Sequence, residues 1–296
     1  MREFSEDLNR QKVAVEGGGS CIYCGSDGRP NGLRDEHMVP YSLGGNAVLL
    51  AASCQACERI TSYLDGYLAN ATYKHVRVHG EIQSRSGHPR VLPALVSING
   101  DERVLSLEPS KHPFFVHMPV WRPPGIMRGA QPSPDFGDVK AHVYWYVPPD
   151  ILETIDLSDG DRAQIQDTTP MPNISTFARA IAKIAYCHAI YVFGLGGFRP
   201  LMLPDVILGR CPNTPFLVGS DLGHPDPPDP RPVSHLVQRS QFTTLRLRLI
   251  TMRIRLFANT GTQDYGMPHY EVVVGSEGRT NWRPRPNLAL PRTIAL

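Results

Sequence analysis

The sequence predicts an α+β fold in which a small metal-stapled N-terminal module is followed by a larger, mainly antiparallel α+β domain. Two Cys-x-x-Cys pairs lie within the first 73 residues. Beyond them, short β-rich runs alternate with Pro and Gly clusters, a pattern typical of antiparallel sheet. One long helical pattern, over residues 175–192, interrupts these runs. We therefore expect two domains, residues 1–73 and residues 74–296.

The composition is that of an ordinary globular protein without a membrane span. Hydrophobic residues make up 41% and charged residues 20% of the 296 positions, which excludes collagen, coiled coils and wholesale disorder. The longest uncharged stretch with a substantial apolar run, residues 184–198, has 15 residues, whereas a helix needs about 20 to cross a bilayer. The N-terminus lacks the apolar core of a secretion signal. We expect a cytoplasmic protein that does not enter a membrane.

The cysteines give the strongest local signal in the chain. Four of the six form the pairs Cys21/Cys24 and Cys54/Cys57, with 29 residues between the pairs. Two residues between cysteines let one turn direct both thiolates at one ion, and four sulfurs complete the closed tetrahedral shell of structural zinc. Because thiols stay reduced in the cytosol, we predict zinc and not disulfides. The other two cysteines are isolated and are expected to be buried free thiols.

Around the second cysteine pair, the pattern predicts two strands followed by a helix. Residues 32–39 and 47–50 can pair as a hairpin through a Gly-Gly turn. A helix over residues 54–69 follows, with Ser53 as its N-cap. Its apolar stripe, which we expect to face the core, consists of Ile60, Tyr63, Leu64, Tyr67 and Leu68. So small a unit buries little apolar surface, and zinc should contribute directly to its folding.

The segment between the cysteine pairs carries a further motif. Asp35, Glu36 and His37 are consecutive, Pro40 follows the histidine by three residues, and Asn46 comes directly after the Gly pair. With the flanking cysteines, this segment resembles the HNH endonucleases, the ββα-metal nucleases, and specifically their zinc-stapled members. The resemblance covers about a fifth of the chain. It implies an enzyme that hydrolyses phosphodiester bonds in DNA with the help of a divalent ion.

The resemblance also assigns roles to individual residues. His37 matches the general base that activates water, which suits an imidazole with a pKa of about 6.5. Glu36 matches the first ligand of a catalytic Mg²⁺ or Mn²⁺, which stabilises charge on the leaving oxygen. Glu58, directly after the last cysteine, falls at the third position, where the family more often has His or Asn. Asn46 matches loosely the middle residue, which pins the hairpin and orients the base.

Other oxygen ligands compete with these assignments. Thr61 and Asp65 lie one and two turns beyond Glu58 on the same face of the predicted helix. In a strand, Asp35 and His37 would point to one side and the residue between them to the other, so Asp35 also remains a candidate ligand. The alternative function is a noncatalytic zinc-stapled module that binds nucleic acid or another partner.

Residues 74–296 are predicted to form an α+β domain that binds the substrate or regulates the module. A helix over residues 175–192 is expected to end at Gly194, and its segment ARAIAKIAYCHAIYVFGLGGF is similar to segments of bacterial proteins with an N-terminal HNH domain. The predicted strands are residues 74–80, 91–98, 114–121, 141–148, 243–257 with a β-bulge near Ile250, and 270–275.

Charge is distributed unevenly between the two predicted domains. Residues 1–73 contain 6 Lys/Arg and 9 Asp/Glu, whereas residues 74–296 contain 24 and 19. Residues 230–263 contain six arginines and no acidic residue. We therefore expect binding to DNA, or alternatively RNA, to come mainly from this arginine-rich segment or from a partner, and residues 1–75 alone to bind DNA poorly. A solvated arginine face on a strand is the alternative interpretation of the segment.

Overall fold

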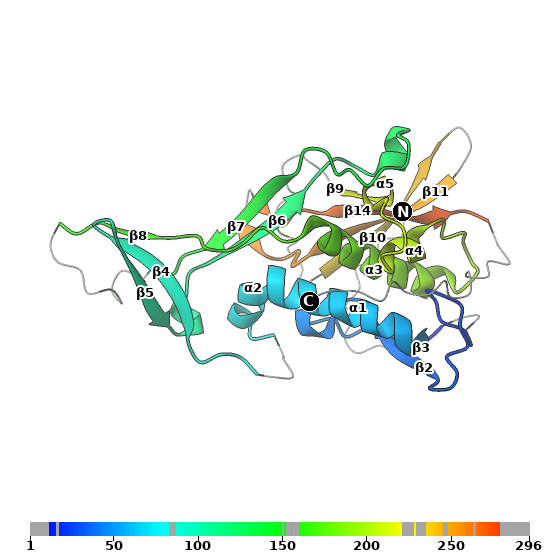
Figure 1. The fold of residues 1–296 in the computed structure, drawn as a ribbon, viewed down its shortest axis with the longest axis horizontal. Coiled ribbons are helices and arrows are strands. Elements are labelled where there is room, and N and C mark those ends of the chain that lie inside the picture. The colour runs from blue at the N-terminus through cyan, green and yellow to red at the C-terminus, as the bar shows by residue number, and fades with distance from the viewer. Residues whose placement is uncertain are drawn as a thin grey trace.

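The computed structural model is a mixed α+β arrangement with mainly antiparallel sheets, as the sequence predicts. Figure 1 shows a body that contains most of the helices and a four-stranded sheet, with a narrow arm of strands extending from one end. Within the described part of the chain, no helix has the length and apolar character needed to span a bilayer. The structure describes residues 12–15, 18–82, 87–149, 151, 155, 160–220, 228, 235–244, 248–262 and 265–278.

The N-terminal part of the body is a three-stranded sheet followed by one helix. β2 (Leu33–His37) pairs antiparallel with β3 (Val48–Cys54), and β1 (Lys12–Ala14) pairs parallel with β3. The register of β2 shifts between Arg34 and Glu36, which places a bulge there. α1 (Gln55–Tyr67) follows β3 without a loop. The predicted order of two antiparallel strands and a helix is therefore observed.

Two details of α1 differ from the prediction. Cys54 occupies the N-cap position without a capping side chain, because Ser53 is still part of β3, where it is fully buried. The expected apolar stripe is buried at Leu64 and Leu68, but Tyr63 keeps 54% of its surface exposed. The ring of Tyr63 therefore lies at the edge of the stripe and faces solvent.

The segment after α1 continues as helix where a strand was predicted. A π-helical turn (Leu68–Thr72) leads into α2 (Lys74–His79). The alternation of valines in KHVRVHG suggested a strand, yet Val76, Arg77 and Val78 are all buried in α2. The prediction of a strand over residues 74–80 is wrong because the packing of this turn on several sides outweighs the local β preference of valine.

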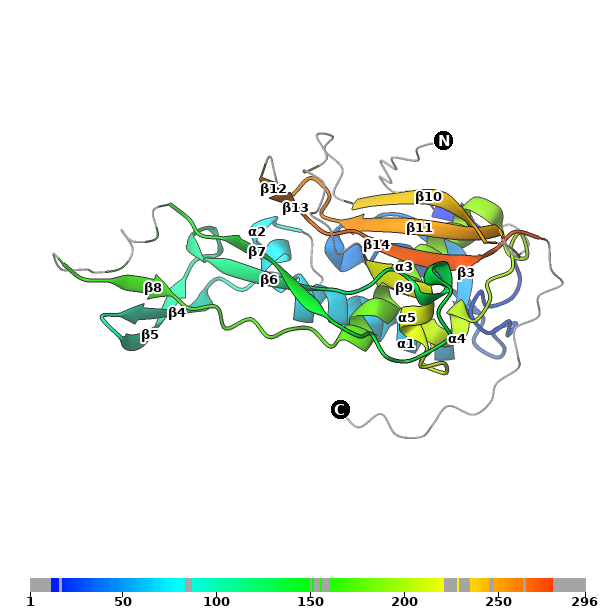
Figure 2. The same ribbon diagram turned by 90° about the horizontal axis from the view of Figure 1, so that it is seen from above.

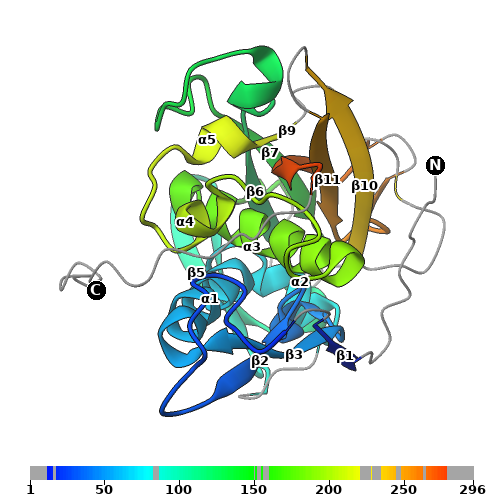
Figure 3. The same cartoon turned by 90° about the vertical axis from the view of Figure 1, so that its right-hand side faces the viewer.

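The long helix α3 (Ile174–Phe193) lies at the centre of the body. The Asn173 side chain caps its N-terminus by accepting a hydrogen bond from the Thr176 amide. Gly194 ends the helix with a positive φ of 72°, which glycine adopts without strain. α3 packs against α1 on one side and against the four-stranded sheet on the other (Figure 3). Because it is enclosed by both, its residues are buried around most of the helix circumference.

The four-stranded sheet has the order β10-β11-β14-β9, and all neighbouring strands in it are antiparallel. The predicted bulge is present between Ile250 and Thr251 in β11. One hydrophobic cluster runs from the N-terminal sheet through α3 to these strands, so the core is continuous across residue 73. The sheet strands are β9 (Val218–Ser220), β10 (His235–Thr243), β11 (Arg248–Leu256) and β14 (Tyr270–Ser276). Smaller elements near them are α4 (Leu203–Ile207), α5 (Thr214–Leu217), β12 (Gly261–Thr262) and β13 (Tyr265–Gly266).

The arm consists of a two-stranded ladder that leads to a three-stranded sheet away from the body (Figures 1 and 2). The ladder pairs β6 (Phe114–Val120) with β7 (Lys140–Tyr146). The outer sheet has the order β5-β4-β8 and contains β4 (Leu92–Ile98), β5 (Asp101–Leu107) and β8 (Ala163–Ile165). Its apolar residues form two small clusters separate from the main core.

Candidate zinc centre and buried charge cluster

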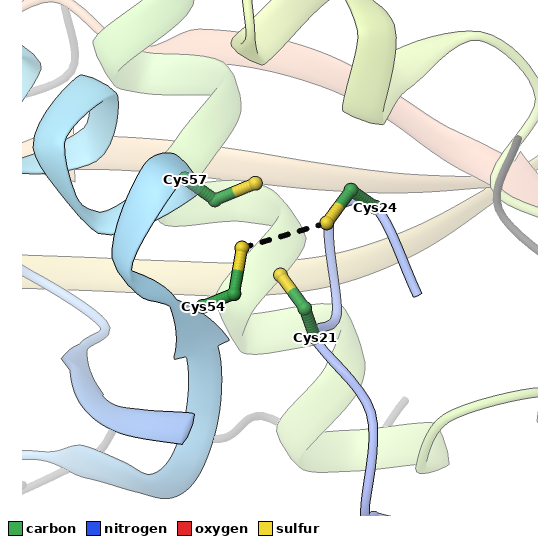
Figure 4. Close-up of side chains that lie close together, drawn as sticks. All are labelled: Cys21, Cys24, Cys54 and Cys57. Atoms are coloured by element: carbon green, nitrogen blue, oxygen red, sulfur yellow. Dashed lines mark hydrogen bonds between the residues drawn. The ribbon is translucent and has the colours of Figure 1, made fainter. Parts of the chain in front are cut away.

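The four paired cysteines lie together where β3 meets α1 (Figure 4). Cys21 and Cys24 come from the turn before β2, Cys54 ends β3, and Cys57 lies in the first turn of α1. All four are buried, and their sulfur atoms lie within 4.8 Å of one another. Sulfurs bound at 2.3 Å in a tetrahedral zinc site are about 3.8 Å apart, and the Cys24 and Cys54 sulfurs are separated by 3.6 Å.

The thiols of the cluster hydrogen-bond to one another, and this shifts the pKa values of Cys24 and Cys57 in opposite directions. Hydrogen bonding with Cys21, and then with Cys57, lowers the pKa of Cys24 to about 4. Hydrogen bonding with Cys21 and Cys24 raises the pKa of Cys57. The cluster therefore shares protons among crowded sulfurs, and a zinc ion would replace those protons. Such an ion would cross-link the turn, β3 and α1, and its four protein ligands would leave no position for substrate.

A second polar centre surrounds the buried carboxylate of Glu36 in β2. One of its oxygens accepts a hydrogen bond from the Thr61 hydroxyl at 3.0 Å, and the other lies 3.1 Å from Nζ of Lys183. The same Nζ lies 3.0 Å from a carboxylate oxygen of Asp65 and donates to the backbone carbonyl of His37. The Lys183 ammonium thus joins β2, α1 and α3, and we call these five residues the Lys183 cluster.

Charge compensation keeps the ammonium of Lys183 protonated. Burial by itself lowers the pKa of this fully buried side chain, but the charges of Asp65 and Glu36 raise it above the ordinary value. Burial raises the pKa of Asp65 to about 7, although the attraction of Lys183 acts in the opposite direction. The cation that neutralises these carboxylates is therefore the Lys183 ammonium, a side chain of the protein.

The Lys183 cluster does not fit the Mg²⁺ or Mn²⁺ that the sequence predicts at Glu36. A hard divalent cation needs carboxylate oxygens with open coordination positions. Both oxygens of Glu36 are already bonded, and a positive charge occupies the space between this carboxylate and Asp65. Thr61 and Asp65, the competing ligands, are brought to Glu36, but they surround an ammonium. The geometry argues against the predicted metal-ligand role of Glu36.

Glu58 and Asp35 lie in different surroundings from Glu36. The Glu58 carboxylate accepts a hydrogen bond from Arg34 at 2.9 Å and is partly exposed. Asp35 is exposed and accepts a hydrogen bond from the Ala51 amide at 3.1 Å. Among the described residues, the four cysteines are the one group of three or more His, Cys, Asp or Glu side chains close enough to hold an ion. Glu36, His37 and Glu58 do not form such a group.

His37 ends β2 opposite Val48, and its half-buried ring lies 5.7 Å from the ring of Tyr41. Because the side chains of neighbouring residues in a strand point to opposite faces, the His37 and Glu36 side chains lie on opposite faces of β2. Asn46 is half-buried and precedes β3. The general-base role of His37 and the orienting role of Asn46 remain predictions.

The arginine-rich segment is largely engaged within the four-stranded sheet. Arg255 is buried and donates to the Met267 carbonyl at 3.1 Å. Arg248 lies 3.6 Å from Glu277, and Arg253 is the register partner of Glu271. The acidic residues that the segment itself lacks come from β14 and the turn after it, and this favours the interpretation as an ordinary strand face. Two further arginines of this segment, outside the described residues, are Arg231 and Arg246.

Lys183 is a site residue that the sequence patterns did not predict, and it lies 118 positions from Asp65. A signal was present, since Lys183 is the one charged residue of the run AIAKIAYC, residues 180–187. A lysine at such a position needs a buried partner.

Comparisons of the chain with protein-family models, with curated proteins and with solved structures gave no match.

Proposed function

We propose that the N-terminal module is a zinc-stapled module that binds nucleic acid without cutting it. The observation that carries this proposal is the Lys183 ammonium, 3.1 Å from Glu36 and 3.0 Å from Asp65. Metal-dependent hydrolysis needs an ion that can meet a phosphate oxygen, and Glu36, at 4% exposure, offers no free oxygen to such an ion. The cytoplasm, where thiols stay reduced for zinc, is the location that we propose.

The outer face of α1 is the surface that suits nucleic acid best. Arg59 and Tyr63 lie one turn apart on α1, and both side chains are exposed. An exposed aromatic ring can stack on an unpaired base while a neighbouring guanidinium contacts the backbone. The module has an excess of acidic residues, which weakens phosphate attraction. Stacking should therefore supply much of the affinity, and single-stranded DNA, or alternatively RNA, is the expected partner.

Fluorescence anisotropy with a labelled single-stranded DNA and the full-length protein, at one fixed salt concentration, tests this surface. Tyr63→Ala should weaken binding about tenfold, because one stacked base contributes about 1–3 kcal/mol. Trp145→Ala is the matched control, since Trp145 is also an exposed aromatic residue (61%) but lies on the arm. Equal affinity of Tyr63→Ala and the unaltered protein would reject α1 as the binding surface.

Metal-dependent cleavage of DNA is the second candidate function, and the place of His37 favours it. A half-buried imidazole ends the strand of a zinc-stapled strand–strand–helix unit, as the resemblance to HNH endonucleases requires. Plasmid nicking in Mg²⁺ or Mn²⁺, with EDTA as control, separates the two functions. Our proposal predicts no nicking above the level of His37→Ala. Nicking that His37→Ala abolishes, with zinc still at one per chain, would establish the nuclease instead.

A further inference from the structure

We infer that the Lys183 ammonium takes the place of a divalent cation in this module, so that Glu36, Asp65 and Thr61 form a latent hard-cation site that the lysine fills. The inference rests on the proposed function and deepens it, because it names the cation that a noncatalytic module uses instead. It also predicts that the unaltered protein folds independently of Mg²⁺ and Mn²⁺.

The donor set around Nζ is the first support for this inference. The ammonium has three N–H donors, and three oxygens receive them, one each from Glu36, Asp65 and the backbone of His37. The Thr61 hydroxyl holds the second oxygen of Glu36. Two carboxylates, a carbonyl and a hydroxyl group are the oxygen ligands that Mg²⁺, Mn²⁺ and Ca²⁺ bind in proteins.

The burial of the cluster is the second support. Lys183 is fully buried and Glu36 nearly so, which means that the carboxylates depend on a cation that water cannot replace well. Shortening Lys183 would leave two carboxylates facing the vacated space. Among the described residues, Oδ1 of Asp65 is buried and has no hydrogen-bond partner, while Oδ2 faces the ammonium, so this carboxylate would have both oxygens available to an ion in the vacated space. The vacated space also leaves room for the water ligands that a small divalent ion retains.

Titration with Mn²⁺, followed by electron paramagnetic resonance, tests the inference on the full-length, zinc-loaded protein. Lys183→Ala should bind one Mn²⁺ at least about tenfold more tightly than the unaltered protein, since two carboxylates then lack a cation. The double variant Lys183→Ala/Glu36→Gln should lose that gain. Lys140→Ala, which removes an exposed lysine of β7, should behave as the unaltered protein does.

If Lys183→Ala is unfolded without metal, Mn²⁺ should restore its helical circular dichroism. A Lys183→Ala protein that neither binds Mn²⁺ nor refolds with it would overturn the inference. It is equally overturned if the unaltered protein binds one Mn²⁺ and Glu36→Gln abolishes that binding, because the lysine then does not fill the site.

This test is independent of the test of the proposed function. A Lys183→Ala protein that ignores Mn²⁺ would overturn the latent site, whereas the effect of Tyr63→Ala on DNA affinity would stand. Unchanged DNA affinity of Tyr63→Ala, together with Mn²⁺ binding by Lys183→Ala, would overturn the DNA surface alone.

Discussion

The thiol cluster and the Lys183 cluster gather anionic groups in the same small module, but they obtain their cation in different ways. All four thiols come from residues 21–57 and could hold an ion taken from solution. The carboxylates of Glu36 and Asp65 receive an ammonium from α3, far along the chain. With zinc bound, the first arrangement would couple folding to zinc supply, whereas the second couples it to the packing of α3. The same module therefore has one cluster that would take its cation from solution and one whose cation is a side chain of the protein.

Removing a thiol should have the largest effect, because zinc binding supplies folding energy directly. Cys54→Ser should lower the zinc content from one per chain to none and destabilise the module by several kcal/mol, given about 10–16 kcal/mol for structural zinc in small modules. Elemental analysis and thermal unfolding measure both changes. Cys211→Ser is the matched control, since Cys211 lies outside the cluster. Full zinc content in Cys54→Ser would exclude a four-cysteine site.

Removing the internal cation should have the next largest effect. Lys183→Met should lower the free energy of unfolding by about 3–5 kcal/mol, because it leaves buried carboxylates uncompensated. Urea denaturation measures this loss, and the double variant Lys183→Met/Glu36→Gln should recover part of it. If Lys183→Met is as stable as the unaltered protein, the ammonium does not hold the cluster together. Zinc content should stay at one per chain in both variants.

A third polar centre, at the base of the arm, contains histidine rings that burial keeps uncharged at neutral pH. The ring of His75 stacks on His112 at 5.1 Å, and burial, followed by the charges of His112 and Lys74, lowers the pKa of His75 to about 4. A histidine with a lowered pKa stabilises the fold above its ordinary pKa of about 6.5, and this stabilisation is lost as pH falls toward 4.

We therefore expect the thermal midpoint to fall between pH 6.5 and pH 4 in a His75-dependent manner. His75→Gln should flatten this part of the pH profile, because glutamine does not titrate, and circular dichroism at several pH values measures the effect. His88→Gln is a control outside this cluster. Identical pH profiles of His75→Gln and the unaltered protein would show that His75 does not sense the change.

The surface pair of Arg34 and Glu58 should contribute least. The two side chains keep 43% and 30% of their surface exposed, and exposed ion pairs contribute about 0–1 kcal/mol. Glu58→Ala should change the free energy of unfolding by less than about 1 kcal/mol and leave zinc content unaltered. A loss of bound Mn²⁺ in Glu58→Ala would instead restore Glu58 as a metal ligand, and the same titration detects it.

Local sequence patterns predicted the structural features that depend on residues close together in the chain. The cysteine spacing predicted the thiol cluster, the helical period predicted α3 and its end at Gly194, and a change of alternation predicted the bulge beside Ile250. Contacts between segments far apart in the sequence could not be predicted from these local patterns. The alternating valines of α2 suggested a strand, and nothing near Glu36 in the sequence indicates that α3 supplies its cation.

Helix α3 also sets the smallest piece of this chain that can be studied alone. The Tyr186 hydroxyl donates to the Ile22 carbonyl at 2.7 Å, and Tyr23 lies 3.2 Å from the Cys187 sulfur, so α3 supports the very turn that presents two thiols. A fragment that stops at residue 75 would lose these bonds together with Lys183 and would expose apolar residues of the core. A transplant of this four-cysteine unit into another protein therefore has to include α3.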